Sequence, residues 1–388
     1  MRVIVDKNNP FVAEVFKGFG DVTALGTKDI TRESVQNADV LVVRSETKVT
    51  SELLEGSSVR FVGTATIGTD HVDIGYLRSR RIGFASAPGS NANSVAEYIV
   101  ASLLTLAERR GFRLEDKTIA VVGVGNVGSK VVRNARALGM TVLENDPPLS
   151  RKTGDARFLP LDDIMNADFI SLHVPLTKAG SDPTYHLFDS TRIRKMKKEA
   201  TLINTSRGSV VDGVALSQVI ADGHLGGVVL DVWEDEPEID TALLIKTDIG
   251  TPHIAGYSFD GKLSAVRQVH AAACKFFGQQ ENWEIEKLIP KPSVERITIP
   301  SEKIHGRSEE SLLGTIVRQC YDIECDDRSL RSILDVPVEE RWLYFRRLRA
   351  EYRVRREFFN TTVELPDSLP SMREPLTAIG FRVEMIHW

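Results

Sequence analysis

Three polar side chains follow three successive strand-like segments in the middle of this sequence. Arg207 follows ATLINTS, Glu236 follows GGVVLDVW, and His253 follows TDIG. Histidine titrates near neutral pH and can take the proton of a hydroxyl group, and a carboxylate on its other ring nitrogen would fix its tautomer. Arginine can hold a carboxylate through two parallel hydrogen bonds. The set predicts removal of a hydride and a proton from a secondary alcohol that lies next to a carboxylate.

Each of these residues also has a purely structural interpretation. Arg207 can be a surface turn residue and His253 a strand cap. Glu236 is one of four neighbouring acids, with Glu234, Asp235 and Glu238. The functional interpretation gains weight in a doubly wound parallel sheet, because the carboxyl ends of its strands share one crevice with the nucleotide.

The sequence GVGNVG supplies such a nucleotide site. Gly123, Gly125 and Gly128, with Asn126 and Val127 between them, join the strand-like TIAVV to the helical SKVVRNARAL. The three glycines would allow a tight turn, close approach to a pyrophosphate, and close packing of helix on strand. The helix N-terminus would face the phosphate charge.

Asp146 ends the next strand-like run, MTVLEND, where a carboxylate would accept hydrogen bonds from the adenosine ribose. A carboxylate there repels a 2′-phosphate, and Pro147 and Pro148 follow in place of an arginine. NAD is therefore predicted as the cofactor in preference to NADP. The alternative is a phosphate-free glycine turn with Asp146 as a cap.

Strand-like runs alternate with helical patterns up to about Phe277, which predicts an α/β fold. We expect two doubly wound parallel-sheet (Rossmann-type) domains plus a small C-terminal α+β domain. The helical run 91–111 begins with Ser94 and Glu97 at capping-box spacing. The expected strands are MRVIVD, ADVLVVRS, VRFVGTAT and RIGFASAP in the first block, and KTIAVV, MTVLEND, ADFISLHVP, ATLINTS, GGVVLDVW and TDIGTPH in the second.

The motifs VGVGNVG, INTSRGSVVD, LDVWEDEP and TPHIAG resemble those of the D-isomer-specific 2-hydroxyacid dehydrogenases, from Met1 to about Phe277. The resemblance implies that Arg207 binds substrate, Glu236 orients His253, and His253 is the acid/base. It also implies a discontinuous substrate-binding domain, residues 1–94 plus 256–285, and an NAD-binding Rossmann domain, residues 95–255.

Within that family, VVRSETKV, FVGTATIGTDHVD, ENDPP, TPHIAGYSFDGK and the long tail resemble a branch that acts on a small phosphorylated hydroxy acid. The resemblance implies a homodimer formed through a C-terminal domain, residues 290–388. Arg44 and Lys48 are candidates to neutralise the phosphate. The implied substrate contacts are Ser45, Thr66 and Tyr257; the implied NAD contacts are Asp146, Val174, Thr205, Ser206, Arg207, Asp231 and Gly256.

The tail contains an arginine-rich segment, EERWLYFRRLRAEYRVRREFF, which has helical spacing. The expected buried stripe consists of Trp342, Phe345, Leu348, Tyr352 and Phe359. The interleaved glutamates favour a solvated face or a subunit interface over nucleic acid. A further hypothesis is that Arg346, Arg349, Arg353 or Arg356 reaches the phosphate site of a second copy.

Composition narrows the class of protein. With 49 basic and 54 acidic residues in 388, there is no overall cationic charge that would favour nucleic acid or a membrane surface. No apolar run is long enough to span a membrane, no signal peptide is recognisable, and the three cysteines form no metal or disulfide motif. We expect a cytoplasmic protein without a metal. The alternatives are a dehydrogenase for 3-phosphoglycerate or another D-2-hydroxy acid, and an NAD-sensing corepressor-like binding protein.

Overall fold

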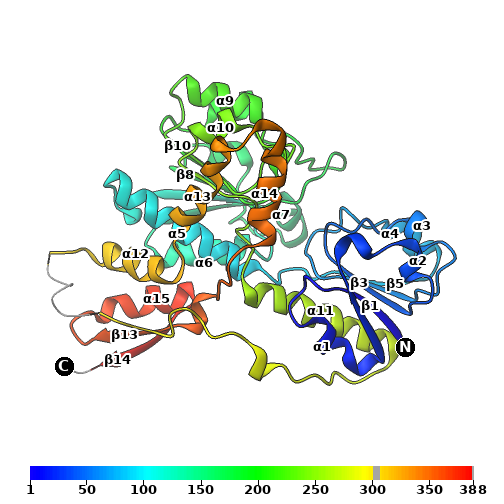
Figure 1. Ribbon diagram of the computed structural model, residues 1–388. Coiled ribbons are helices and arrows are strands. Elements are labelled where there is room, and N and C mark those ends of the chain that lie inside the picture. The colour runs from blue at the N-terminus through cyan, green and yellow to red at the C-terminus, as the bar shows by residue number, and fades with distance from the viewer. Residues whose placement is uncertain (300–305, 387–388) are drawn as a thin grey trace. The chain divides into compact units, whose positions relative to one another are not determined.

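The computed structural model describes residues 1–299 and 306–386, and within these ranges the chain forms three parallel β-sheets (Figure 1). Residues 300–305 and 387–388, which belong to the predicted C-terminal domain, lie outside the described residues. The chain divides into two compact units, Met1–Ala92 with Tyr257–Lys291, and Asn93–Gly256 with Pro292–Trp388. Two parallel α/β sheets and a small third sheet confirm the predicted fold class.

The first unit is a doubly wound sheet with the strand order β2-β1-β3-β4-β5. Of these strands, β2 was not predicted, since DVTAL contains only two β-branched residues and lacks a continuous apolar run. The strands are β1 (Arg2–Asp6), β2 (Asp21–Leu25), β3 (Val40–Val43), β4 (Phe61–Thr64) and β5 (Gly83–Ala85). The helices are α1 (Val12–Phe16), α2 (Arg32–Val35), α3 (Ser51–Leu54), α4 (Ile74–Ser79) and α11 (Phe259–Phe277).

Alternation along β3 explains why this sheet is covered on both faces. Val40 and Val42 pack into a cluster with residues of α1 and α11, whereas Leu41 and Val43 pack into a cluster with residues of α2, α3 and α4. All four side chains are fully buried. A continuous apolar run is typical of a strand with helices on both sides.

The second unit contains a six-stranded parallel sheet with the order β11-β10-β9-β8-β6-β7. The strands are β6 (Thr118–Val122), β7 (Thr141–Asn145), β8 (Phe169–Leu172), β9 (Thr201–Asn204), β10 (Gly227–Leu230) and β11 (Ile249–Gly250). The helices are α5 (Ala92–Arg110), α6 (Gly128–Ala137), α7 (Pro147–Thr153), α8 (Ser190–Lys195), α9 (Gly213–Ala221) and α10 (Thr241–Lys246). Each strand lies where the sequence predicted one.

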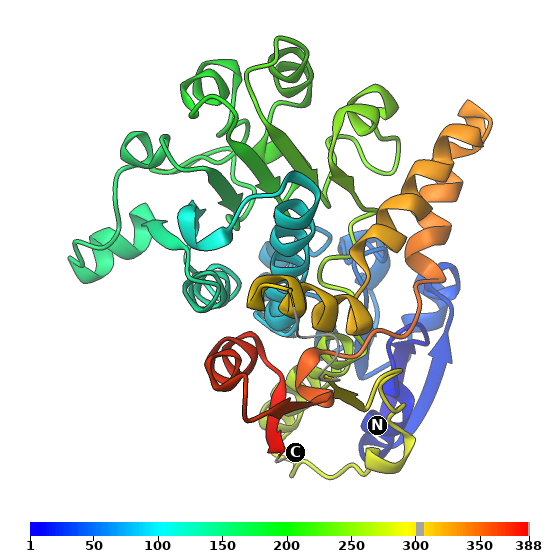
Figure 2. The same ribbon diagram turned by 90° about the vertical axis from the view of Figure 1, so that its left-hand side faces the viewer.

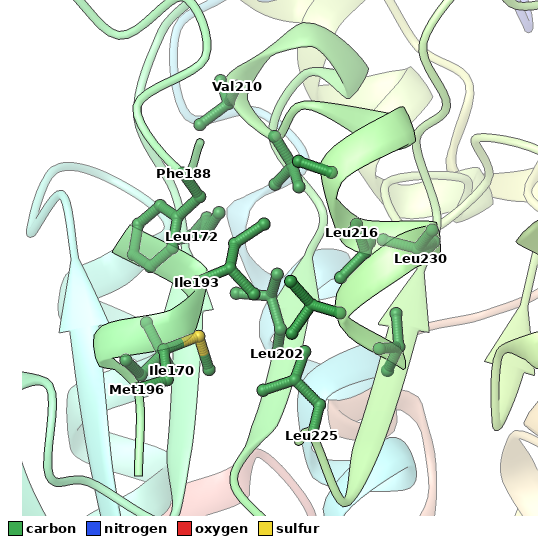
Figure 3. Close-up of a cluster of buried hydrophobic side chains, with 14 of the residues drawn as sticks. Ile170, Leu172, Phe188, Ile193, Met196, Leu202, Val210, Leu216, Leu225 and Leu230 are labelled. Atoms are coloured by element: carbon green, nitrogen blue, oxygen red, sulfur yellow. The ribbon is translucent and has the colours of Figure 1, made fainter. Parts of the chain in front are cut away.

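One face of this sheet packs against α8 and α9 through a buried aliphatic cluster (Figure 3). Ile170 and Leu172 of β8, Leu202 of β9 and Leu230 of β10 meet Ile193 of α8 in this layer. This packing holds β8, β9 and β10 in place, and therefore also holds the carboxyl ends of these strands, where the next loops begin.

The third sheet has the order β12-β13-β14 and belongs to the C-terminal region. Helix α15 of this region packs against α6, and α13 and α14 run side by side (Figure 2, orange). The strands are β12 (Arg296–Thr298), β13 (Thr362–Pro366) and β14 (Arg382–Ile386). The helices are α12 (Glu309–Cys320), α13 (Ile323–Arg331), α14 (Arg341–Ala350) and α15 (Arg373–Ile379).

Helix α13 covers the edge strand β11 of the six-stranded sheet. Asp327 accepts a hydrogen bond from the backbone N–H of Gly250 (2.7 Å) and pairs with Arg331 (2.9 Å). Arg331 donates to the carbonyls of Leu244 and Thr247. The C-terminal region thus satisfies the N–H of Gly250 in the edge strand and two carbonyls in the segment before it.

A local prediction for the first residues of α5 was wrong. Helix α5 begins at Ala92, so Ser94 and Glu97 lie inside it and form no capping box. Their side chains bond instead to Glu357 and to the backbone of Phe358. Local spacing suggested the cap, but partners that are distant in the sequence compete for the same polar groups.

The arginine-rich helix is also shorter than its periodicity predicted. Helix α14 ends at Ala350, and the predicted stripe is only partly buried, since Phe345 is fully buried but Trp342 is 39% exposed. Residues 352–357 leave the helix and run toward the start of α5. There Arg355 bonds to the carbonyl of Ser94 and Glu357 to its hydroxyl, and these contacts outweigh continued helix formation.

Candidate active site

Six strand ends along one edge of the second sheet carry the predicted NAD-site and catalytic residues. Across the sheet, the loops after β7, β6 and β8 supply Asp146, the glycine loop and Val174. The loops after β9, β10 and β11 supply Arg207, Glu236 and His253. The chain crosses over β6 between β7 and β8, which creates the topological switch point where nucleotides bind in such sheets.

The glycine loop has the shape of a pyrophosphate cradle. Gly123 has a φ of +86°, and a Cβ on Gly128 would lie 1.9 Å from the carbonyl oxygen of Gly123. A Cβ on Gly125 would meet nothing within 4 Å. The first and third glycines are therefore required by the protein itself, whereas the second leaves open space in front of α6. That combination fits a phosphate group bound at a helix N-terminus.

We predict that Gly125→Ala separates cofactor binding from folding. The new methyl group has room in the protein but projects into the cradle, so NAD affinity should fall by about tenfold or more without a change in Tm. Calorimetric titration with NADH and thermal unfolding without ligand measure the two effects. Gly128→Ala is the control that should lower Tm, since its Cβ overlaps a backbone carbonyl. Undiminished affinity in Gly125→Ala would place the phosphates elsewhere.

Asp146 is held against the glycine loop by two backbone hydrogen bonds. One carboxylate oxygen accepts from the N–H of Val124 (2.9 Å), and the other caps α7 through the N–H of Leu149 (2.9 Å). The two bonds fix the position of the carboxylate in the place predicted for ribose recognition.

We predict that Asp146→Ala weakens NAD binding and relaxes discrimination against NADP. Loss of the helix cap should also cost about 1 kcal/mol of stability. Asp322→Ala is a matched control, because Asp322 caps α13 through the N–H groups of Glu324 and Cys325 and follows helix α12, not a strand of the site. Titrations with NADH and NADPH measure the ratio of affinities. The same ratio in wild type and Asp146→Ala would contradict ribose recognition by this residue.

Asn204, the last residue of β9, shapes the turn that presents Arg207. Its amide donates to the carbonyl of Arg207 (2.9 Å), and its oxygen accepts from the N–H and the hydroxyl of Ser206. A Cβ on Gly208 would lie 2.0 Å from the carbonyl oxygen of Trp233. The Arg207 turn therefore packs directly against the segment that leads to Glu236.

Glu236 and His253 form a hydrogen-bonded pair between Oε1 and Nδ1. The other carboxylate oxygen accepts from the N–H of Trp233 (3.1 Å). The imidazole is 29% exposed, so its free nitrogen face is accessible to a small molecule. Burial raises the pKa of Glu236, but the charge and hydrogen bond of His253, the charge of Arg349 and the N–H of Trp233 outweigh it, and the pKa lies below its ordinary value. Glu236 is thus a carboxylate at neutral pH.

The structure distinguishes among the neighbouring acids. Glu236 is the one whose side chain meets His253, while Glu234 pairs with His186 (2.7 Å) and accepts from the N–H of Gly213 (3.1 Å). Sequence alone left this choice open, because all the acids lie on one short loop.

A buried carboxylate beneath the His253 loop holds its backbone. Asp231 is 1% exposed and accepts from the hydroxyl of Thr251 (2.6 Å) and the N–H groups of Ile254 (2.7 Å) and Ala255 (2.9 Å). Burial raises the pKa of Asp231, and the charge of His253 and these hydrogen bonds offset this only in part. His253 itself has a φ of +58°, a conformation that a histidine keeps only where its surroundings enforce it.

His173 is a site residue that the sequence analysis missed. It follows β8, one residue before Val174, and its ring nitrogens contact the hydroxyls of Ser171 (2.9 Å) and Thr205 (3.3 Å). Burial lowers its pKa to about 3, so it stays neutral. Its position directly after a predicted strand was the available signal.

The predicted substrate residues lie in the first unit. Ser45 follows β3 and Thr66 follows β4, so adjacent parallel strands bring them to one edge. The hydroxyl of Thr66 bonds to Thr64 (2.8 Å) and to the carbonyl of Gly68 (2.9 Å). The ring of Tyr257 faces the ammonium group of Lys262 at 4.4 Å. Contact of these residues with substrate remains a prediction.

Among the residues that the structure describes, no group of three His, Cys, Asp or Glu side chains is arranged to hold a metal ion. Nor is any described helix both long enough and apolar enough to cross a membrane.

Two parts of the chain match known domain families. Residues 91–255 match the D-isomer specific 2-hydroxyacid dehydrogenase, NAD binding domain. Residues 288–380 match a domain of unknown function.

Curated relatives match nearly the whole chain. An erythronate-4-phosphate dehydrogenase from Escherichia coli is 43% identical over 382 residues, which are 98% of each chain. One from Salinibacter ruber is 43% identical over 99% of each chain.

Solved structures resemble the part before the tail. A D-lactate dehydrogenase from Aquifex aeolicus, complexed with NAD and lactic acid, is 26% identical with a TM-score of 0.58 and covers 72% of this chain and 96% of its own. An NAD-bound 3-phosphoglycerate dehydrogenase in Entamoeba histolytica is 23% identical with a TM-score of 0.62, covers 74% and 98% respectively, and shares the fold.

Proposed function

The chain belongs to the erythronate-4-phosphate dehydrogenases, within the D-isomer-specific 2-hydroxyacid dehydrogenase family, and we propose that it oxidises 4-phospho-D-erythronate at C2 with NAD. The product is the 2-oxo acid, 3-hydroxy-2-oxo-4-phosphooxybutanoate. The proposal includes a place for this reaction in the synthesis of pyridoxal 5′-phosphate (vitamin B6).

The observation that carries the mechanism is the Glu236–His253 pair at the end of the NAD-binding sheet. Glu236 accepts from Nδ1, which leaves Nε2 to take the proton of the C2 hydroxyl. The carboxylate charge stabilises the imidazolium that results, because the two groups interact most strongly when both are ionised. Because the loop already holds the ring, His253 would accept the proton without a change in the position of the ring.

Arg207 provides the complementary charge. Its guanidinium would hold the substrate carboxylate and polarise the oxygen on C2, since its turn packs against the loop that carries Glu236. When bound, NAD supplies the acceptor for the hydride. Asp146 and the glycine loop orient it from the other side of the switch point.

The phosphate end of the substrate is assigned to the first unit. Arg44 and Lys48 flank Ser45 in the loop after β3, and Arg44 is half-buried whereas Lys48 is exposed. Two cations beside a hydroxyl match a dianionic phosphate better than a neutral group. Ser45, Thr66 and Tyr257 complete the proposed substrate contacts.

We extend the proposal to a homodimer formed through the C-terminal region. Val338, Leu343 and Val354 are 72%, 54% and 60% exposed there, which is apolar surface that a second copy would cover. Among the tail arginines, Arg353 pairs with Asp326 and Arg356 bonds to Asn360 (2.7 Å) in their own chain.

We also keep the cytoplasm as the proposed location, because the cysteine spacing predicts reduced thiols.

A panel of 2-hydroxy acids, each with and without a terminal phosphate, tests the function through NADH absorbance. We expect 4-phospho-D-erythronate to give the highest kcat/KM, and erythronate a much lower value. Higher activity with 3-phosphoglycerate or an unphosphorylated acid would replace the proposed substrate. NAD affinity without turnover of any acid would indicate a binding protein.

A further inference from the structure

Arg355 is a buried cation in a segment whose other arginines are mostly at the surface. It is 3% exposed, whereas Arg346 and Arg347 are exposed. Its guanidinium lies 4.1 Å from the centre of the Tyr321 ring and 3.8 Å from a carboxylate oxygen of Glu97. Removing a guanidinium from water is costly, and such a group is kept only where specific partners compensate. The partners of Arg355 therefore indicate the structural role of segment 352–357.

Its hydrogen bonds join two distant parts of the NAD-binding sheet domain. Nη2 donates to the carbonyl of Ser94 (2.9 Å) and, over a longer distance, to the carbonyl of Ala255 (3.5 Å). The chain passes between its two compact units at Ala92–Asn93 and at Gly256–Tyr257. A third passage lies at Lys291–Pro292, so Arg355 bonds beside two of the three places where the chain passes between the units.

Neighbouring residues fix Arg355 to the start of α5. Glu357 accepts from the hydroxyl of Ser94 (2.7 Å) and from the amide of Asn93 (3.2 Å), and the N–H of Phe358 donates to Glu97 (2.7 Å). Phe358 is fully buried, and its ring stacks on that of Phe381 at 4.6 Å. Since backbone and side chains are both held, the guanidinium has a defined position.

The second bond leads to the loop that carries His253. Ala255, whose carbonyl accepts from Arg355, donates its own N–H to Asp231, as does Ile254. Asp231 also accepts from Thr251, whose hydroxyl contacts Tyr98 of α5 (2.8 Å). The loop is therefore held by hydrogen bonds to Asp231, to Tyr98 of α5 and to Arg355 of the C-terminal region.

We propose that Arg355 is a positioning residue for His253, acting through the carbonyl of Ala255. The C-terminal region then contributes to the rate of proton transfer as well as to assembly. This role rests on the proposed function of His253 as the acid/base. A displacement of about 1 Å at a reacting group can cost about 10²-fold in rate, so a distant anchor can matter.

The test compares Arg355→Lys with Arg341→Lys. Nη2 makes both carbonyl bonds. Lysine keeps the charge near Glu97, but its side chain ends one bond short of the position of Nη2. Arg341 is a matched control, because it also bonds two carbonyls, those of Val336 and Leu334, at the start of α14 and away from the His253 loop. We expect Arg355→Lys to lower kcat by about tenfold or more, with KM and NADH affinity nearly unchanged. Arg341→Lys should alter Tm at most.

A double mutant separates positioning from general damage. If Arg355 acts through His253, adding Arg355→Lys to His253→Ala should lower kcat no further. Additive losses, or equal losses in Arg355→Lys and Arg341→Lys at equal Tm, would overturn the proposal.

Hydrogen exchange gives a readout that does not depend on the substrate. The amides of Ile254 and Ala255 should exchange about tenfold faster in Arg355→Lys than in wild type, while those of β8 stay protected. Unchanged exchange would overturn the role of Arg355 even if the enzyme is active. Faster exchange in a protein that turns over no hydroxy acid would support the anchor and contradict only the proposed function.

Discussion

Replacing His253 with alanine should lower kcat by about 10²–10⁴-fold while leaving NADH affinity close to that of wild type. The imidazole is held by Glu236 through Nδ1, so its loss removes the proposed proton acceptor and little else. The predicted NAD contacts lie mainly at the ends of β6, β7 and β8, which this substitution does not touch. Initial rates of NADH formation at pH 7, with calorimetric NADH titration, measure the two quantities.

The choice of pH follows from the state of Glu236. Its pKa in the folded protein lies below the ordinary value, so the stability that the ionised carboxylate contributes is present above that ordinary value and is lost as the pH falls through the folded pKa. At pH 7 the carboxylate is ionised in wild type, and a loss of rate in His253→Ala reports on the imidazole. His224→Ala is the control, because His224 precedes β10 at the opposite edge and bonds to the carbonyl of Met196 (2.9 Å). Comparable rates in wild type and His253→Ala would remove His253 from the mechanism.

Replacing Arg207 with lysine should lower kcat/KM by about 10- to 100-fold, although the charge is retained. Lysine lacks the planar fork, and one lost hydrogen bond to a charged group is worth roughly 1.5–3 kcal/mol. Both KM and kcat should suffer, because the guanidinium is proposed to hold the carboxylate and polarise the C2 oxygen. The side chain of Asn204 shapes the turn independently of the Arg207 side chain, whose own bond to the turn is to the carbonyl of Ser206 (2.8 Å), so Tm should change little.

Steady-state kinetics with the phosphorylated acid measure this effect, and Arg194→Lys is its control. Arg194 pairs with Asp222 at 2.5 Å on an exposed surface, where an ion pair contributes little. If Arg207→Lys shows the kinetics of Arg194→Lys, then Arg207 is only a turn residue.

The sequence by itself determined the two doubly wound parallel sheets and the edge at which the predicted NAD and catalytic residues lie. A continuous apolar run such as VLVV is fully buried only in a strand with helices on both faces of its sheet. The glycine spacing has a steric cause, since a Cβ at Gly128 would overlap the carbonyl oxygen of Gly123. Arg207, Glu236 and His253 follow adjacent strands, and parallel topology alone brings such loops together. These features are local, or follow from the order of strands.

Only the tertiary structure decided which polar groups become partners. Local spacing made Ser94 and Glu97 a capping box and placed the tail arginines on a solvated face, but segment 355–358 binds the first two and buries Arg355. Likewise, folding selected Glu236 for His253 and placed neutral His173 between two hydroxyls. Buried polar groups must find partners wherever the chain supplies them, and residues far apart in sequence supply most of them here, so no local pattern identifies them in advance.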